Sequence, residues 1–253
     1  MAEPLFDKLT VHPAYRVVAE AIERNILMGR LKTGDKLPSE IELAKQFGVH
    51  RSTVREGIRL LEQSGLVTRF GRTALEVTLP HFQDLASRAS RALSMHKVSF
   101  RELWEASMLT EPAAAEMAVD HITDDELARL RENLRAMRES VDNTEAFVRL
   151  DTEFHDLLAL ATRNKVIVMM REPISLLFMP AGQIILPRLK TYDRVIHAHA
   201  MILDAIEKRD KATVREWMTR HMADFHRAYD RTGLDIDQPM QMPESALSPQ
   251  RPE

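Results

Sequence analysis

The strand pattern of this sequence is confined to one short stretch, and that restriction fixes the class of fold. LVTRF at 66–70 and ALEVTL at 74–79 have the residues of two short strands, and GRT between them supplies the turn. Before this stretch and after Pro80, apolar residues recur at intervals of three and four. Only 8 of the 253 residues are Gly, so little interrupts a helical pattern. The sequence therefore predicts a mainly α protein with a single β-hairpin.

Three amphipathic helices are expected ahead of the hairpin. Apolar residues at helical spacing predict the first helix over 14–28, and a capping box at Ser39 opens the second. The third begins near Arg51 and ends at Gly65, a helix C-cap residue. Three helices followed by a hairpin are typical of a winged helix-turn-helix, whose third helix enters the DNA major groove. We expect this DNA-binding domain to cover residues 10–80.

A second domain, an all-helical bundle, is expected over residues 81–232. The expected helices cover 82–96, 99–120, 124–141, 145–162, 165–178, 192–208 and 211–230. Pro173, Pro180 and Pro187 are expected to kink or divide the fifth of these helices, because proline removes a backbone donor. Residues 233–253 carry four prolines among polar side chains, which predicts a disordered tail.

Composition excludes several classes of protein. No run of about 18 uncharged apolar residues is present, so no transmembrane helix and no membrane partner are expected. The N-terminus lacks the basic-then-apolar pattern of a signal peptide. With no cysteine in the chain, disulfide and thiolate chemistry are excluded. These features predict a cytoplasmic protein.

The start of the third helix has the residue types that read DNA. Four side chains project from its N-terminal end: Arg51, Ser52, Thr53 and Arg55. Arginine can donate two hydrogen bonds to guanine, and hydroxyl groups can hold phosphates. A solvated charged face would show the same pattern, but the hairpin carrying Arg69 and Arg72 favours DNA binding, because it forms a wing. Positive charge at one helix end suffices for this role, although the net charge of the chain is −3.

The segment GRLKTGDKLPSEIELAKQFGVHRSTVREGIRLLEQSGLV, residues 29–67, resembles the DNA-binding domain of the GntR family of bacterial repressors. The resemblance implies that Arg51, Thr53 and Arg55 occupy the operator-reading positions, and that Gly71 occupies the tip of the wing. Three residues depart from the family pattern: His50 replaces a capping Ser or Thr, Ile41 an arginine, and Gly57 an alanine. We expect the weaker cap and the glycine to cost about 1 kcal/mol each.

In the second domain, one acidic residue and three histidines point to a metal site. Asp151 and His155 lie four residues apart on one helix and therefore share a face. His199 and His221 lie on the apolar stripes of two other helices. Imidazole and carboxylate groups together suit a divalent ion inside a helical bundle. An ordinary Asp–His hydrogen bond with two core histidines fits the spacing as well, so the spacing leaves both alternatives open.

Three motifs resemble the FCD-type effector domain of the FadR subgroup within the GntR family. They are EASMLTEP at 105–112, DTEFH at 151–155, and HAMILDAI at 199–206 followed by His221. The resemblance implies that one divalent metal ion, namely zinc, nickel, iron or manganese, is bound by four residues: Asp151, His155, His199 and His221.

The same resemblance implies a small-molecule effector, expected to be an organic acid, beside the metal. Asn164 matches a polar residue that faces the effector pocket in the family. Ser107 stands where the family commonly has an arginine that clamps a carboxylate. Arg101 is a candidate replacement for that arginine, with Arg149 and Arg163 as alternatives.

Together these features predict a ligand-responsive transcription regulator that is not an enzyme. We expect a homodimeric repressor that binds a palindromic operator and is released by its effector. The alternative is a helical metal-dependent hydrolase or oxygenase with a DNA-binding appendage. An enzyme would need a general base, and beyond the four candidate ligands no second carboxylate or nucleophile occurs at motif spacing. Glu153 and Asp156 flank His155 but are expected to turn partly away from it.

Overall fold

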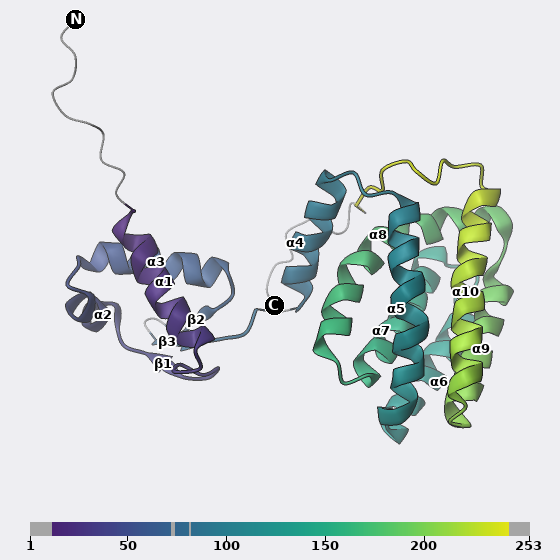
Figure 1. Cartoon of the computed structure of the whole chain (residues 1–253), viewed down its shortest axis with the longest axis horizontal. Helices are drawn as coiled ribbons and strands as arrows, with labels where there is room; N and C mark the ends of the chain where they lie inside the picture. The colour runs from purple at the N-terminus through teal and green to yellow at the C-terminus, as the bar shows by residue number, and fades with distance from the viewer. Residues whose placement is uncertain (1–11, 72–73, 81, 243–253) are drawn as a thin grey trace, which may run out of the picture. The chain divides into compact units, whose positions relative to one another are not determined.

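The computed structural model describes residues 12–71, 74–80 and 82–242. The chain divides into one unit that ends at His81 and a second that begins at Phe82. The described residues form ten helices and three short strands, so the mainly α fold predicted from the sequence is confirmed (Figure 1). Within the described residues, no helix combines the length and the apolar character needed to span a membrane.

The first unit is a three-helix domain with a small antiparallel sheet. Its elements are α1 (Ala14–Leu27), β1 (Lys36–Leu37), α2 (Glu40–Phe47), α3 (Arg51–Gln63), β2 (Val67–Phe70) and β3 (Ala74–Val77). The strand order is β1-β3-β2, and the predicted hairpin is the β2–β3 pair. Val54, Ile58 and Leu61 of α3 are buried against α1 and the sheet, which leaves the opposite face of α3 free.

Helix capping and one glycine explain where the helices of the first unit begin and how closely two of them pack. The Ser39 hydroxyl accepts the backbone N–H of Glu42 at 3.2 Å and caps α2, whereas His50 gives α3 no side-chain cap. At Gly57, an added Cβ would lie 2.8 Å from the Tyr15 carbonyl oxygen. The departure from alanine at this position therefore lets α1 lie closer to α3 than a side chain would permit.

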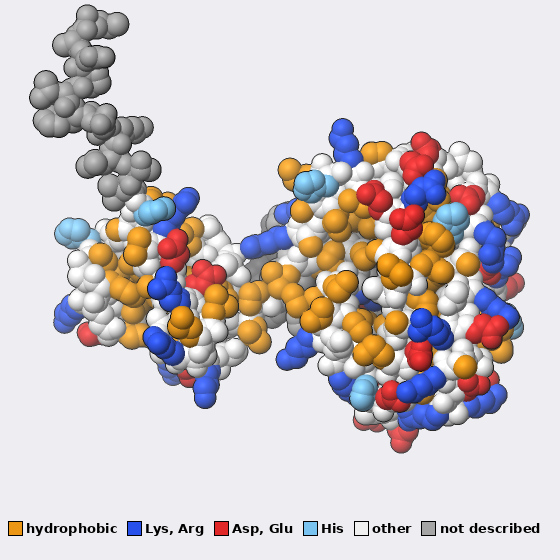
Figure 2. All heavy atoms as spheres, viewed as in Figure 1, with side chains coloured by type: hydrophobic (Ala, Val, Ile, Leu, Met, Phe, Trp, Pro, Cys, Tyr) orange, Lys and Arg blue, Asp and Glu red, His pale blue; other side chains and the backbone are white. Residues whose placement is uncertain are grey.

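The second unit is a bundle of seven helices. They are α4 (Phe82–Met95), α5 (Phe100–His121), α6 (Asp124–Glu139), α7 (Thr144–Ala161), α8 (Lys165–Leu189), α9 (Tyr192–Glu207) and α10 (Lys211–Arg231). Helix α10 packs along α5 and α9, and α7 packs along α5, α6 and α8. Capping boxes at Ser99 and Thr123 start α5 and α6. On the face shown in Figure 2, acidic and basic side chains are mixed over this unit, which agrees with its modest net charge.

Helix α8 is longer than the predicted segment 165–178. It continues to Leu189 and contains Pro173, Pro180 and Pro187. The prolines are seven residues apart, so their missing donors fall close to one stripe of the helix. The helix also buries Leu177 and other apolar side chains in the core of the unit. This packing outweighs the tendency of the prolines to end the helix.

Residues 233–242 follow α10 and are ordered against the bundle, although the sequence predicted disorder from 233 onward. The Met240 side chain is buried, and its backbone N–H donates to the Val98 carbonyl at 2.8 Å. Arg101 donates to Asp237 at 2.6 Å. This C-terminal segment, yellow in Figure 1, therefore fastens the end of α10 to the junction of α4 and α5. The rest of the predicted tail, 243–253, lies outside the described residues.

Candidate functional site

The exposed face of α3 carries the predicted DNA-reading residues. Arg51, Ser52 and Arg55 are exposed and Thr53 is half-buried, while Val54 and Ile58 point inward. Gly71 lies at the hairpin turn with φ +66° and has open space around it, which suits close approach to another molecule. Arg72, the other predicted wing residue, lies outside the described residues.

Glu40 holds two arginines of this surface in place. Arg51 Nε donates to Glu40 at 3.1 Å and Arg69 Nη2 donates to it at 2.9 Å. Burial opposes ionisation of Glu40, but the hydrogen bonds from Arg69 and Arg51 outweigh it and lower the pKa of the carboxyl group. The carboxylate therefore links the start of α3 to the wing. No sequence motif had indicated this role.

In the second unit, the four predicted metal ligands lie together. Asp151 and His155 come from α7, His199 from α9 and His221 from α10. One ligand atom from each of them lies within 4.8 Å of the others. The Nε2 atom of His221 is 3.2 Å from that of His155 and 3.3 Å from that of His199. Asp151 Oδ1 lies 3.4 Å from His199 Nε2. The three histidines are buried.

The protons available to these imidazoles cannot satisfy all of their contacts. His155 Nδ1 lies 3.0 Å from the Glu111 carboxylate and donates to it, and His155 Nε2 faces His221 Nε2 at 3.2 Å. A proton on His221 Nε2 can serve only one of its two histidine neighbours. Burial, together with the neighbouring histidines, lowers the pKa of His199 well below its usual value and that of His221 to about 3, so both are neutral at pH 7. Lone pairs therefore converge, which fits a bound cation.

Glu111 connects this cluster to a buried arginine. Burial opposes its ionisation, yet Arg171 and His155 together lower its pKa to about 2. Arg171 donates to Glu111 at 2.9 Å, and it also binds Asp156 and the Thr152 carbonyl. Glu111 belongs to the quoted EASMLTEP motif, but its contact with His155 was not predicted. Arg171 was missed as well; its one signal was a charged residue inside the apolar run of α8.

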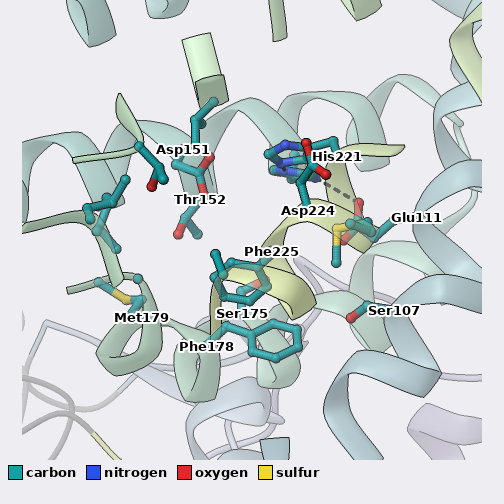
Figure 3. Close-up of a pocket in the computed structure, with 18 of the residues that line it drawn as sticks. Ser107, Glu111, Asp151, Thr152, Ser175, Phe178, Met179, His221, Asp224 and Phe225 are labelled. Atoms are coloured by element: carbon teal, nitrogen blue, oxygen red, sulfur yellow. Dashed lines mark hydrogen bonds and ion pairs between the residues drawn. The ribbon is translucent and has the colours of Figure 1, made fainter. Parts of the chain in front are cut away.

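A cavity of about 210 Å³ opens beside the cluster. Figure 3 shows Asp151, His221, Asp224 and Glu111 along one side of it and Met179, Phe178 and Phe225 along the other. Besides Arg171, its polar lining includes three more arginines that sequence reasoning missed: Arg194, Arg227 and Arg231. The cavity therefore combines a polar wall with an apolar one, as small-molecule sites commonly do.

Of the three predicted effector residues, the structure brings one to the cavity. Ser107 is buried in its lining. Asn164 does not line it; its side chain caps α8 by accepting the backbone N–H groups of Val166 and Ile167. Arg101 does not line it either, because it pairs with Asp237 of the C-terminal segment. The proposed roles of Asn164 and Arg101 in effector binding therefore have no support from this geometry.

Comparisons with known proteins agree with the two-unit architecture. Residues 14–77 match the domain described as bacterial regulatory proteins, gntR family, and residues 102–224 match the FCD domain. The HTH-type transcriptional repressor NanR of Salmonella newport (strain SL254) is 28% identical over 217 residues, which cover 81% of each chain. The protein of the same name from Salmonella typhimurium (strain LT2) is 28% identical over 217 residues, covering 81% of this chain and 80% of its own.

A solved structure has the same fold. The GntR protein of Streptococcus agalactiae aligns with a TM-score of 0.57 at 23% sequence identity, over 84% of this chain and 99% of its own. This likeness supports the order of a winged domain followed by a helical bundle. With both matched domains in that order, the chain is identified as a GntR family regulator that carries an FCD domain.

Proposed function

We propose that this chain is a ligand-responsive repressor of the FadR type, controlled by a small molecule that binds beside a divalent metal ion. One observation carries the proposal: three imidazoles and a carboxyl group converge within 4.8 Å of one another beside a cavity. Within this group, Asp151 Oδ1 and His199 Nδ1 are buried without a hydrogen-bond partner among the described residues, whereas a purely structural cluster would pair its buried polar atoms. The relatives named above are transcriptional repressors, which supports the same direction of control.

Asp151, His155, His199 and His221 would hold the ion. Three nitrogen ligands and one oxygen ligand suit zinc, nickel, iron or manganese better than calcium or magnesium, which prefer oxygen. A bound ion would supply positive charge for an acidic effector. The side chain of Asp151 is about one-third exposed, at 33%, so the cluster is accessible from the cavity rather than sealed.

The winged unit would bind operator DNA through α3. Arg51 and Arg55 lie exposed at its N-terminal end, and both can donate to guanine. Two copies of the chain in a homodimer would match the two halves of a palindromic operator. Sedimentation equilibrium tests the dimer, and a monomer at tens of micromolar, with and without DNA, would refute it.

Metal binding is tested by calorimetric titration of chelator-stripped full-length protein. His199→Ala and His221→Ala should lose metal uptake, while His197→Ala should retain it. His197 is a matched control because it lies on α9 but contacts Trp217, at 5.4 Å between ring centres, instead of the cluster. If the wild-type protein takes up no metal, the proposed effector site is refuted.

DNA binding is tested by fluorescence anisotropy on an operator selected from random sequence. Arg51→Ala and Arg55→Ala should each weaken binding by about 1–3 kcal/mol. Arg131→Ala, an exposed arginine of α6 in the other unit, should leave it unchanged. Wild-type affinity in both α3 variants would rule out the assignment of this surface.

A further inference from the structure

A second, positively charged group of side chains lines the cavity in addition to the histidine cluster. It consists of Arg194 at the start of α9 and of Arg227 and Arg231 near the end of α10. Asp224 is the acidic residue among them: Arg194 Nε donates to it at 2.7 Å, and Arg227 also binds it. Arg231 has no side-chain hydrogen bond or ion pair within the described residues. The region therefore has more positive charge than its own carboxylate can balance.

Charge is distributed unevenly among the arginines of the cavity. Arg171 is matched by Glu111 and Asp156. The other three arginines of the lining share one carboxylate, that of Asp224. The side chains of Arg194 and Arg227 keep 60% and 62% of their surface exposed, so their ion pairs with Asp224 are weak and can exchange with another anion. A ligand acid group can thus replace or join Asp224 there.

The spacing of the histidine cluster and the arginines along α10 follows from helix geometry. His221 and Arg227 are six residues apart on this helix, which corresponds to about 9 Å along its axis. Phe225, Phe178 and Met179 also line the cavity, and Figure 3 shows them opposite Asp151, His221 and Glu111. The cavity therefore presents a cation-binding cluster, an arginine group and an apolar wall.

We propose that the effector is a small dianion with two separated acid groups. One acid group binds at the His–Asp cluster, and the second binds Arg227 and Arg231 through charge-assisted hydrogen bonds. The less polar middle of the ligand packs on Phe178 and Phe225. This inference rests on the proposed function. Ser107 has no positive charge with which to bind an acid group, and the inference assigns that role to arginines of α10.

The test uses metal-loaded, full-length protein and calorimetry. The probes are the straight-chain dicarboxylates from succinate to suberate, each compared with its monomethyl ester. At least one diacid should bind roughly tenfold or more tightly than its ester, because the ester lacks one charge-assisted interaction. In the Arg227→Gln/Arg231→Gln double variant this preference should disappear, while the affinity for the ester and the metal stoichiometry stay unchanged.

Arg220→Gln is the matched control. Arg220 also lies on α10, but it binds Glu216 and lies over Trp217, outside the cavity lining. This variant should keep the preference for the diacid. Equal binding of diacid and ester, or a preference that survives in the double variant, overturns the inference. Metal uptake and operator binding are measured on the same preparations, because they test the proposed function separately. If the protein still takes up metal and binds the operator but shows no preference for a diacid, only the dianion is refuted.

Discussion

Replacing Glu111 by glutamine tests whether a single buried carboxylate supports both the fold and the histidine cluster. The carboxylate accepts from His155 on one side and from Arg171 on the other. Glutamine has nearly the same shape but no charge. If its amide oxygen accepts from Arg171, its NH₂ group faces His155 Nδ1. That nitrogen must then become an acceptor, so the ring proton moves to Nε2, the atom that faces the other two histidines.

The size of the effect follows from the pKa of Glu111, which is about 2 in the folded protein against an ordinary value of 4.5. This difference corresponds to about 3 kcal/mol of stability. Because the folded pKa is the lower one, the stabilisation is fully present above about pH 4.5 and is lost as the pH falls toward 2. At pH 7, Glu111→Gln should therefore lose about 3 kcal/mol of unfolding free energy. Metal affinity should fall about 10–100-fold, as is typical when the partner of a ligating histidine is removed.

Urea unfolding followed by tryptophan fluorescence measures the first effect, and competitive metal titration measures the second. Both tryptophans of the chain, Trp104 and Trp217, lie in the second unit, so the signal reports that unit alone. The matched control is Glu116→Gln, which removes a partly exposed carboxylate of α5 paired with Arg215 and should change stability by about 0.5 kcal/mol or less. The reasoning is refuted if the two variants unfold alike and bind metal alike.

Three further predictions follow from the structure. Gly57→Ala should destabilise the winged unit, because the clash with α1 costs about 1–3 kcal/mol against a gain of about 1 kcal/mol in helix propensity. Hydrogen exchange in α1 and α3 should therefore accelerate. Gly182→Ala, whose added Cβ meets only a valine side chain, should leave hydrogen exchange in α1 and α3 unchanged. Metal-free protein should lose stability on acidification below pH 6.5, because the pKa values of His199 and His221 are lowered on folding and the unfolded chain binds more protons. For His221, whose pKa is about 3, the loss is up to about 1.4 kcal/mol per pH unit between pH 6.5 and 3. Equal urea stability at pH 7 and pH 5 would contradict this. Met240→Asp should release residues 233–242, seen as new proteolytic cleavage there, and an unchanged digest would show that burial of Met240 does not hold the segment.

The first unit was predictable because its signals are local. Ser39 caps α2, and Gly48 and Gly65 follow α2 and α3 with positive φ, so the elements are bounded by single residues. Strand β1 is only two residues long and exists through its pairing with β3, a contact between distant parts of the chain. No local pattern marks such a strand.

The histidine cluster was predictable in part because helical spacing assigns each side chain to a face. Helical spacing could not show that Arg171 binds Glu111, since these residues meet only when α8 packs beside α5. The arginines of the cavity were missed for a related reason: on α10, Arg227 and Arg231 alternate with other charged residues and look like a solvated face. The C-terminal segment was misjudged because its prolines indicate disorder, whereas one buried methionine provides the anchor.

The attachment of residues 233–242 to the start of α5 has a consequence for synthesis of the protein. Ser99 and Pro239 form a bridge, so the two partners leave the ribosome 140 residues apart. At about 5–20 residues per second, roughly 7–28 s of translation separate them. The winged unit, which ends at His81, is complete well before that time. A nascent chain therefore holds a finished DNA-binding domain while its second domain is still open. Ribosome-bound chains arrested before residue 233 should be cut by protease near Val98, whereas the released full-length protein should be protected there.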